Sequence, residues 1–268
     1  MTYPQKSFGQ NLLTDKNYLY KIISSVDLES TDTVLEIGSG SGLLTTLLAK
    51  KVKKVFAVEI EKKILIDLER NLEVNKIKNV EIIKSSFLKI NINSLINKPF
   101  KVVGNIPYNI TSKILLKLFG EIDKPAPHLG LLKEIYLMLQ LEVAKRLVAV
   151  KSTKEYSPLT LLVQYFSHPK ILFKVPRGAF YPPPKVDSAF VGFKIKESLP
   201  FVKNKTVLKN IIRVGFQQRR KKIVNSLAKI VEDKKALITA LNKSELKPDL
   251  RVENLSIEDY ITLSNELC

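Results

Sequence analysis

The chain has 268 residues, 45% of them hydrophobic, and a net charge of +18, so it can bury a full core and suits a polyanionic partner such as nucleic acid. No apolar stretch reaches the roughly 20 residues that span a bilayer, and the first residues lack the apolar core of a secretory signal. We therefore expect a cytoplasmic protein without a membrane partner. One cysteine, Cys268, and two distant histidines, His128 and His168, exclude a disulfide framework and a Cys-based metal site and predict no bound metal.

The predicted elements alternate between short strands and helices. An opening segment with a glycine hinge at Gly9 precedes a helix for which Thr14 is the predicted N-cap. Apolar runs then predict strands at 33–37, 54–60, 80–83, 100–103, 134–139, 171–175 and 186–195. Helical patterns follow several of them, at 43–51, 63–75, 112–120 and 140–150. Such alternation predicts an α/β fold with a mostly parallel sheet, and the last two strands predict an antiparallel hairpin at the sheet edge.

The first strand is followed by a glycine-rich turn, in the stretch "VLEIGSGSGLLT" at 34–45. Gly38 and Gly40 let the backbone approach a ligand, and Glu59, about 20 residues on, can accept both hydroxyls of a ribose. The dinucleotide pattern G-x-G-x-x-G would require glycine at Leu43. Glu36 adds a carboxylate that suits an ammonium or sulfonium rather than a pyrophosphate. These residues favour S-adenosylmethionine as the cofactor, with a simple tight turn as the alternative.

The stretch "GNIPYNITS" at 104–112 follows a predicted strand and precedes a helix. The exocyclic amine of adenine is a poor nucleophile, and two acceptors that hold its N–H groups would turn its lone pair toward an electrophile. Asn105 supplies one acceptor, and Pro107 biases Ile106 toward an extended conformation that fixes the Ile106 carbonyl as the second. Tyr108 supplies a ring on which a base can stack. The motif predicts methylation of an adenine amine, with a structural turn and a buried Tyr as the alternative.

Two further stretches lie closer to the C-terminus. In "RGAFYPPPKVDSA" at 177–189, a stiff proline run can present Phe180 or Tyr181 as a second aromatic wall for a flipped base, or can be a rigid loop with core aromatics. From about residue 200 the pattern is helical and polar, which predicts a second, helical domain. Its run "QQRRKK" predicts RNA phosphate contacts on a helix, although general Lys abundance or a solvated helix end would also explain the charge. The predicted contacts are Arg219, Arg220, Lys221 and Lys222.

These motifs together resemble the adenine N6,N6-dimethyltransferases of small-subunit ribosomal RNA, nearly from end to end. The resemblance lies in "FGQNLL" (8–13), "LEIGSGSGLLT" (35–45), "VEI" (58–60), "NIPYNI" (105–110), "GAFYPPPKVDSA" (178–189) and "FQQRRKKIVNSL" (216–227). It implies a Rossmann-like class I methyltransferase domain at 1–199 and a helical RNA-binding domain at 200–268. It also implies a monomer that acts on small-subunit rRNA in a pre-30S particle.

The resemblance also implies roles for single residues. Asn11 and Leu13 are expected to touch the methionine end of the cofactor, Gly38 to cradle it and Glu59 to bind its ribose. Asn105 is expected to serve both the cofactor and the target amine.

The same resemblance implies that Tyr108 and Phe180 enclose the target adenine. One position departs from the family pattern. Relatives carry an Asp after the third strand that accepts a bond from the cofactor's adenine, and here Ser86 occupies that position, a neutral and weaker acceptor.

Four other functions share parts of this pattern. A large-subunit rRNA dimethyltransferase of the antibiotic-resistance type has the same cofactor loop and Asn-Ile-Pro-Tyr motif. A DNA adenine methyltransferase would share the motif, but no separate target-recognition domain is evident. A non-catalytic ribosome-assembly or transcription factor could use the same fold, although the intact motif argues against it. An NAD-dependent dehydrogenase fits least well, because of Leu43.

Overall fold

The computed structural model describes residues 11–231 and 233–268, so the predicted hinge at Gly9 lies outside the described part. The chain divides into two compact units. The first comprises residues 11–118, 126–144 and 169–195, and the second comprises residues 119–125, 145–168 and 196–268. The helical unit thus draws on two earlier stretches as well as the C-terminal one. The division of function at residues 199 and 200 stays a prediction.

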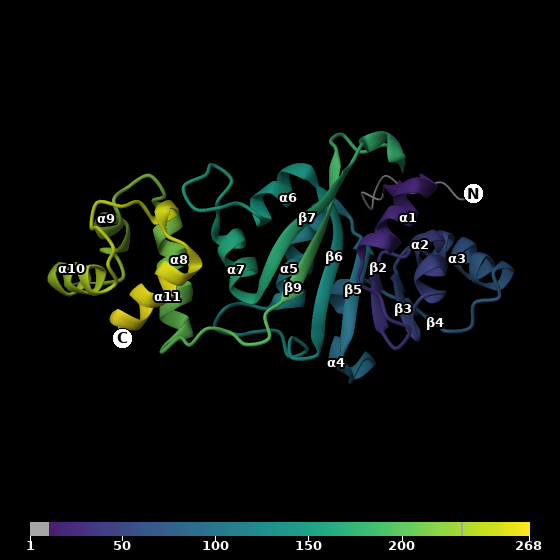
Figure 1. Cartoon of the computed structure of the whole chain (residues 1–268), viewed down its shortest axis with the longest axis horizontal. Coiled ribbons are helices and arrows are strands. Elements are labelled where there is room, and N and C mark those ends of the chain that lie inside the picture. Colours follow the sequence, from purple (N-terminus) through teal and green to yellow (C-terminus); the bar gives the residue numbers. More distant parts are fainter. Residues whose placement is uncertain (1–10, 232) are drawn as a thin grey trace. The chain divides into compact units, whose positions relative to one another are not determined.

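A seven-stranded sheet forms the centre of the first unit, with the strand order β4-β3-β2-β5-β6-β9-β7 (Figure 1). The strands are β2 (Thr33–Ile37), β3 (Lys54–Glu59), β4 (Val80–Lys84), β5 (Phe100–Asn105), β6 (Leu132–Gln140), β7 (Ser167–Val175) and β9 (Ser188–Ile195). The strands from β4 to β6 pair in parallel, whereas β9 pairs antiparallel with β6. The predicted α/β fold class with a mostly parallel sheet is therefore confirmed.

Helices precede, connect and follow the parallel strands. They are α1 (Lys16–Ser25), α2 (Leu43–Ala49), α3 (Lys62–Val74), α4 (Ile92–Leu95), α5 (Thr111–Phe119) and α6 (Leu141–Leu147). α2 packs against β3, α1 and α3. Every residue of β2 is buried, as expected for a central strand that is covered on both faces and reads as an apolar run.

The strand order places a topological switch point at β2. Its neighbours are β3, which follows it in sequence, and β5, which returns from the other side. Crossovers therefore leave β2 in opposite directions, and the loops after β2, β3 and β5 open a crevice at the carboxyl edge of the sheet. Ligands of open α/β sheets bind at this position.

A second, two-stranded sheet joins the start of the described chain to the loop after β7. β1 (Leu12–Leu13) pairs antiparallel with β8 (Phe180–Tyr181). The backbone N–H groups of Thr14 and Asp15 both donate to the Ala179 carbonyl, at 3.0 and 3.2 Å. Neither short strand was predicted, because two residues carry no periodicity.

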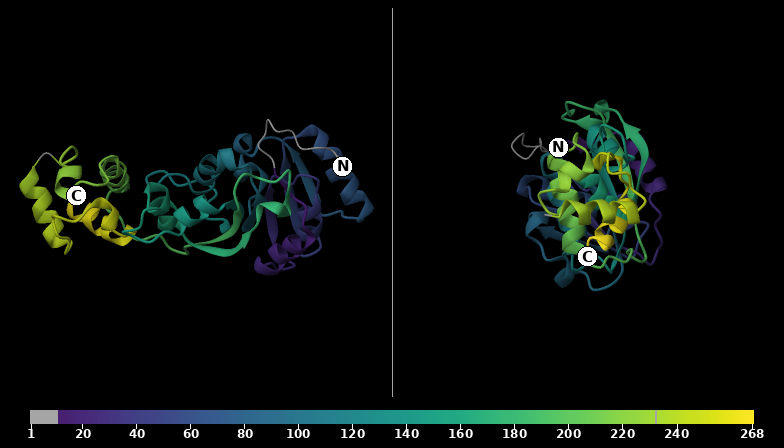
Figure 2. Two further views of the ribbon diagram at one scale, coloured as in Figure 1. Left: turned by 90° about the horizontal axis from the view of Figure 1, so that it is seen from above. Right: turned by 90° about the vertical axis from the view of Figure 1, so that its left-hand side faces the viewer.

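The second unit is helical. Its longer helices are α7 (Pro158–Phe166), α8 (Lys205–Gln217), α9 (Ile223–Leu227), α10 (Lys234–Lys243) and α11 (Ile257–Glu266), and α8 to α11 cluster together in the views of Figures 1 and 2. Fully buried leucines from three helices, Leu208, Leu237 and Leu263, contribute to its core. The predicted helical character after residue 200 is confirmed, whereas α7 was not predicted.

Two local predictions were wrong. The N-cap of α1 is Asp15 rather than Thr14, because the Asp15 carboxylate accepts from the Asn17 N–H at 2.8 Å while the Thr14 hydroxyl reaches back to Ala179. The basic run does not lie on a helix. α8 ends at Gln217, and residues 218–222 form the turn before α9.

Candidate functional site

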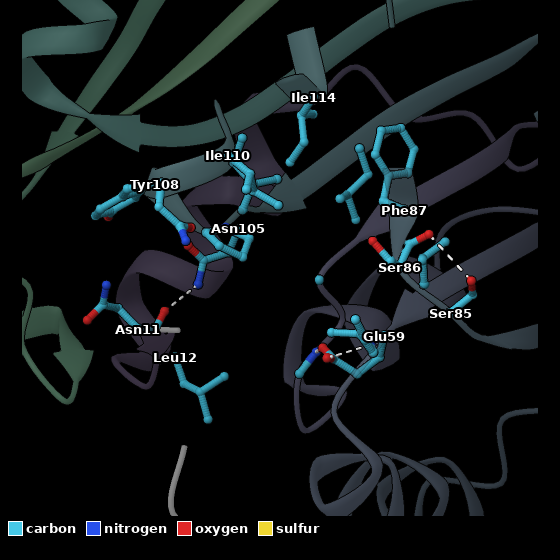
Figure 3. A pocket seen from close by; sticks show the side chains of 18 residues that line it. Asn11, Leu12, Glu59, Ser85, Ser86, Phe87, Asn105, Tyr108, Ile110 and Ile114 are labelled. Carbon is cyan, nitrogen blue, oxygen red and sulfur yellow. Dashed lines mark hydrogen bonds between the residues drawn. The ribbon is translucent and has the colours of Figure 1, made fainter. Parts of the chain in front are cut away.

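A pocket of about 170 Å³ opens at the carboxyl edge of the sheet, at the switch point (Figure 3). Four neighbouring strands each bring residues to it. Gly38 follows β2, Glu59 ends β3, Ser86 follows β4 and Asn105 ends β5. The parallel sheet thus gathers most of the predicted cofactor-binding residues, although they are far apart in sequence.

Glu59 organises the glycine loop from within the pocket wall. Its side chain is 3% exposed, and its carboxylate accepts three backbone N–H bonds, from Gly40 at 2.9 Å, Ile60 at 2.8 Å and Glu61 at 2.9 Å. Charge-assisted bonds of this kind are the stronger ones in proteins. The carboxylate therefore fixes the loop after β2 against the end of β3.

The glycines of the loop are required by close approach. Gly38 has φ +75°, and a Cβ there would lie 3.0 Å from the Asn105 carbonyl oxygen. Gly40 has φ +54°, and a Cβ there would lie 2.9 Å from Leu12 Cδ2. Both are left-handed conformations that other residues adopt only with strain. The bare backbone of this loop forms one wall of the pocket.

Asn105 has a defined side-chain orientation. Its Nδ2 donates to the Asn11 carbonyl at 2.8 Å (Figure 3). Because a carbonyl can only accept, this bond fixes which end of the amide is nitrogen, and Oδ1 must point elsewhere. The N-terminal segment, held by the β1–β8 sheet, thereby leaves the Asn105 oxygen available as an acceptor in the pocket.

The residues after Asn105 complete this side of the site. Ile106 is 2% exposed, and Pro107 has an extended conformation with φ −60° and ψ 128°. Tyr108 is partly buried, lines the pocket and hydrogen-bonds through its hydroxyl to Ser188. Burial raises the pKa of the Tyr108 phenol, so the hydroxyl stays protonated.

Glu36 lies behind the glycine loop. It borders a smaller cavity of about 30 Å³ that Leu13 and Asn105 also line. The side chain is 1% exposed, and burial raises the pKa of its carboxyl to about 8. The Thr45 hydroxyl opposes this shift, and the Glu59 charge adds to it. Among the described residues, Glu36 Oε2 has no hydrogen-bond partner.

Comparison with known proteins decides the family. The family model of ribosomal RNA adenine dimethylases matches residues 2–268. This chain belongs to the ribosomal RNA adenine dimethylase family. It is therefore an rRNA adenine dimethylase, and its cofactor is S-adenosylmethionine.

Relatives and solved structures resemble this dimethylase over nearly their full length. The protein named ribosomal RNA small subunit methyltransferase A from Caldanaerobacter subterraneus is 39% identical, over 98% of this chain and 97% of the relative. The protein of the same name from Crocosphaera subtropica is 37% identical, over 99% of this chain and 98% of the relative. A dimethyladenosine transferase structure from Plasmodium falciparum has a TM-score of 0.80 and 29% identity, covering 94% of this chain and 95% of that one. The structure of the 23S rRNA methyltransferase ErmE has a TM-score of 0.74 and 27% identity, covering 96% of this chain and 99% of that one.

The site residues of this dimethylase fit its cofactor. The unpartnered Glu36 Oε2 is a buried acceptor suited to an ammonium group, which would favour the ionised carboxylate. The Gly38 backbone suits an uncharged part of S-adenosylmethionine, and the Glu59 carboxylate suits a part that carries hydroxyls. Among the described residues, no group of three or more His, Cys, Asp and Glu side chains is placed to hold a metal ion. No described helix is long and apolar enough to cross a membrane.

Some predicted site residues lie outside the main pocket. Phe180 is 2% exposed and packs in the hydrophobic core of the first unit, outside the pocket lining, whereas its neighbour Tyr181 is 49% exposed. Leu13 is 6% exposed and borders only the smaller cavity. The basic residues 219–222 belong to the second unit.

Sequence reasoning also missed residues that the structure brings to the pocket. Ile60, Phe87, Ile110 and Ile114 form much of its apolar lining, and their apolar character alone could not distinguish them from core residues. Lys117 holds the loop after β4 in place, because its ammonium donates to the carbonyls of Leu88, at 2.9 Å, and Ile90, beside the Phe87 ring. No sequence signal indicated that role.

We expect Ser86→Asp to strengthen binding of S-adenosylhomocysteine about threefold to tenfold, because an ionised acceptor roughly doubles the strength of a hydrogen bond. The strand order β5-β2-β3-β4 supports this expectation. If the reacting end lies at Asn105 and the ribose at Glu59, the adenine of the cofactor would reach Ser86. Isothermal titration calorimetry measures the change, with Ser86→Asn as the neutral control. Equal affinities for the Asp and Asn variants would contradict this placement of the adenine.

Proposed function

We propose that this dimethylase adds two methyl groups to the N6 amine of each of two adjacent adenosines in a hairpin loop near the 3′ end of small-subunit (16S) rRNA, during ribosome biogenesis. The main support is the name of its relatives, small subunit methyltransferase A, at up to 39% identity over nearly the whole chain. An unpaired adenine in a loop can enter a pocket without breaking a base pair. The substrate would be the rRNA of a pre-30S particle, met by a monomer in the cytoplasm.

The geometry of Asn105 supports the chemistry of this proposal. Bound S-adenosylmethionine supplies a methyl group on a positively charged sulfonium. Asn105 Oδ1, oriented by the Asn11 carbonyl, accepts one N–H bond of the adenine amine, and the Ile106 carbonyl accepts the other. The nitrogen lone pair then leaves conjugation with the ring and would form the new bond to the methyl group as the bond from methyl to sulfur breaks, leaving S-adenosylhomocysteine. The proton that the amine loses would pass to solvent. The Tyr108 ring stacks on the base, and Phe180 stays a proposed second wall that would require Phe180 to leave the core.

The same loops hold the cofactor in this proposal. Asn11 and Leu13 lie at its methionine end, with Glu36 facing the ammonium and Gly38 and Gly40 cradling the chain between them. Glu59 accepts from the ribose, and Ser86 accepts from the adenine. In support, Asn11, Gly38, Gly40, Glu59 and Ser86 all line the main pocket, whereas Leu13 and Glu36 border the smaller cavity beside it.

A large-subunit activity is the second candidate, because the 23S rRNA methyltransferase ErmE matches the fold with a TM-score of 0.74 over 96% of this chain. Incubation with labelled S-adenosylmethionine and separate, unmodified ribosomal subunits distinguishes the two. We expect label in the small subunit. Label in the large subunit alone would favour the ErmE-type activity, and no label in either would favour a non-catalytic factor.

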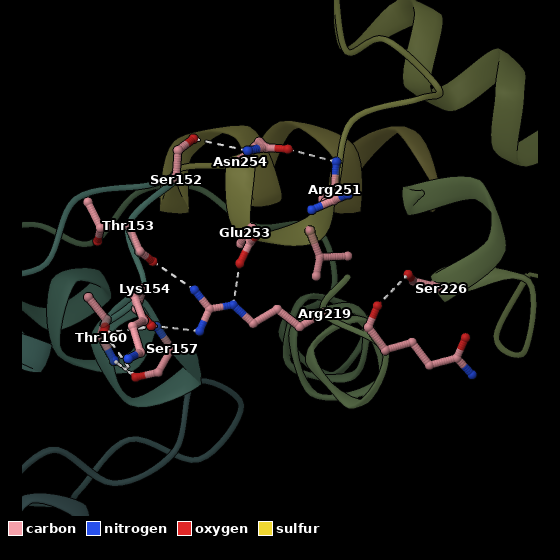
Figure 4. A network of polar contacts seen from close by, with 12 residues as sticks. Ser152, Thr153, Lys154, Ser157, Thr160, Arg219, Ser226, Arg251, Glu253 and Asn254 are labelled. Carbon is pink, nitrogen blue, oxygen red and sulfur yellow. Dashed lines mark hydrogen bonds and ion pairs between the residues drawn. The ribbon is translucent and has the colours of Figure 1, made fainter. Parts of the chain in front are cut away.

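The basic run 219–222 supports an RNA contact for only part of its length. Arg219 pairs with Glu253 and donates to the carbonyls of Thr153, at 2.7 Å, and Lys154, at 2.8 Å (Figure 4). Its guanidinium therefore ties the turn after α8 to two other segments of the second unit. Arg220, Lys221 and Lys222 are exposed, and we propose that they contact RNA phosphates. The predicted phosphate contact of Arg219 would have to compete with its internal bonds.

We expect Arg219→Ala to lower the melting temperature by about 5 °C, because it leaves Glu253 and two carbonyls without their donor. Replacing Arg220 and Lys221 by Ala should leave the melting temperature unchanged. It should also flatten the salt dependence of RNA binding by about one unit of log–log slope per lost contact. Thermal denaturation and filter binding at several salt concentrations measure both effects. An unchanged slope in the double variant would exclude these two residues as phosphate contacts.

A further inference from the structure

The hydroxyl of Tyr108 is held by a residue with no role in the site so far. Ser188 is the first residue of β9 and is 0% exposed, and its side-chain oxygen hydrogen-bonds to the Tyr108 hydroxyl. The two residues are 80 positions apart in sequence. A buried hydroxyl requires a partner, and this bond satisfies both groups at once.

Ser188 is a rigid anchor because the chain on both sides of it is fixed. Ser188 itself lies opposite Gln140 in the β6–β9 ladder. The preceding Asp187 accepts through its carbonyl from the Leu141 N–H at 2.9 Å. The Asp187 carboxylate also accepts from the Arg177 N–H at 3.0 Å. The serine hydroxyl is therefore placed by the sheet rather than by a flexible loop.

The backbone of Tyr108 is held in place, but its side chain requires a further contact to fix it. Its carbonyl accepts from the Thr111 hydroxyl at 3.1 Å, so its backbone is held in the turn after β5. The first side-chain torsion, χ1, has three staggered positions, and each places the tyrosine ring at a different site. A hydrogen bond at the tip of the ring, far from the backbone, fixes the position of that end and so opposes swinging of the whole ring about χ1.

We propose that Ser188 is a positioning residue for methyl transfer, whose hydroxyl fixes the position of the Tyr108 ring against which the target adenine lies. The proposal rests on the proposed role of Tyr108 as the stacking surface. Ser188 does not touch the substrate. It acts through Tyr108, so removing the hydroxyl of either residue should lower the methylation rate by the same factor. Removing both hydroxyls should lower the rate no further.

A double-mutant cycle tests this, with Ser188→Ala, Tyr108→Phe and the double variant. We expect each single change to lower the single-turnover methylation rate at saturating small subunits on the order of fivefold, and the double variant to be lowered by a similar factor, since one hydrogen bond is lost in all three. Affinity for S-adenosylhomocysteine should stay within about twofold of the wild type, because the bond does not touch the cofactor end of the site. Ser264→Ala is the matched control, a fully buried serine in α11 whose hydroxyl donates to the Ile261 carbonyl.

Independent losses that multiply in the double variant, or a wild-type rate for Ser188→Ala, would overturn the proposal. If Ser188→Ala destabilises the fold, Tyr108→Phe removes the same bond without altering β9, and a wild-type rate for that variant would also overturn it. Tyr108→Ala separates this failure from failure of the proposed function. A wild-type rate for Tyr108→Ala would remove the stacking role itself, whereas an inactive Tyr108→Ala with a fully active Ser188→Ala would reject only the role of Ser188.

Discussion

Asn105→Ala should lower the turnover number for methyl transfer by about 10²–10³-fold, the effect of removing one preorganised hydrogen-bonding group from an active site. The reason is the fixed orientation of the amide. Nδ2 is committed to the Asn11 carbonyl, which leaves Oδ1 for the proposed bond to the amine of the target. The interaction forms mainly in the transition state, so the loss should appear in turnover rather than in binding of RNA or of S-adenosylhomocysteine. Single-turnover kinetics with unmodified small subunits, together with calorimetry, separate the two.

Asn105→Asp sharpens this test. The aspartate keeps an acceptor oxygen but cannot donate to the Asn11 carbonyl, and two acceptors at 2.8 Å repel each other. We expect a loss of activity comparable to that of the alanine variant. An Asn105→Asp variant with near wild-type turnover would show that an acceptor alone suffices, and would remove the orienting role of Asn11. Substantial activity in Asn105→Ala would reject the amine-holding role altogether.

Glu59→Gln should weaken binding of S-adenosylhomocysteine on the order of 10²-fold, because hydrogen bonds to a charged group contribute about 1.5–3 kcal/mol each and more than one is affected. The glutamine keeps one acceptor oxygen, which can serve the Ile60 and Glu61 N–H groups, but its NH₂ group then faces the Gly40 N–H, which loses its acceptor. The glycine loop would lose its connection to β3, and any ribose contact would weaken at the same time. Calorimetric titration with S-adenosylhomocysteine measures the loss.

Glu81→Gln is the matched control for this variant. Glu81 lies on the neighbouring strand β4 and pairs with Lys54 at 2.9 Å, with a half-exposed side chain, so its neutralisation should leave cofactor affinity unchanged. Thermal denaturation would show whether Glu59→Gln also destabilises the fold. Unchanged affinity in Glu59→Gln would mean that the carboxylate neither orders the loop nor contacts the cofactor.

Much of the first unit could be predicted because its strands are central and parallel. A strand such as β2, buried along its whole length, reads as an apolar run, and the helices between strands imply right-handed crossovers. The β1–β8 pairing could not be predicted, since each strand has two residues and they are about 170 positions apart. The same pairing displaced the predicted N-cap, because Ala179 engages Thr14 and leaves Asp15 to cap α1.

Some features of the site could likewise be predicted from local sequence, whereas others depend on contacts between distant residues. The glycine loop, Glu59 and the Asn105 motif follow strands directly, so their meeting at one edge of the sheet was predictable. The bond from Asn105 to the Asn11 carbonyl and the bond from Tyr108 to Ser188 depend on tertiary contacts over 94 and 80 positions. The internal pairing of Arg219 with Glu253 is a contact of the same kind, which a run of basic residues cannot reveal.

Mass spectrometry of the reaction product can show whether this dimethylase adds two methyl groups to each of two adjacent adenosines in small-subunit rRNA. Unmodified small ribosomal subunits would be incubated with this dimethylase and S-adenosylmethionine, and the 16S rRNA digested with ribonuclease. We expect N6,N6-dimethyladenosine at two neighbouring positions of one loop near the 3′ end, and its absence after reaction with Asn105→Ala. Monomethyladenosine as the only product, or dimethyladenosine found only in large-subunit rRNA when that subunit is offered, would contradict it.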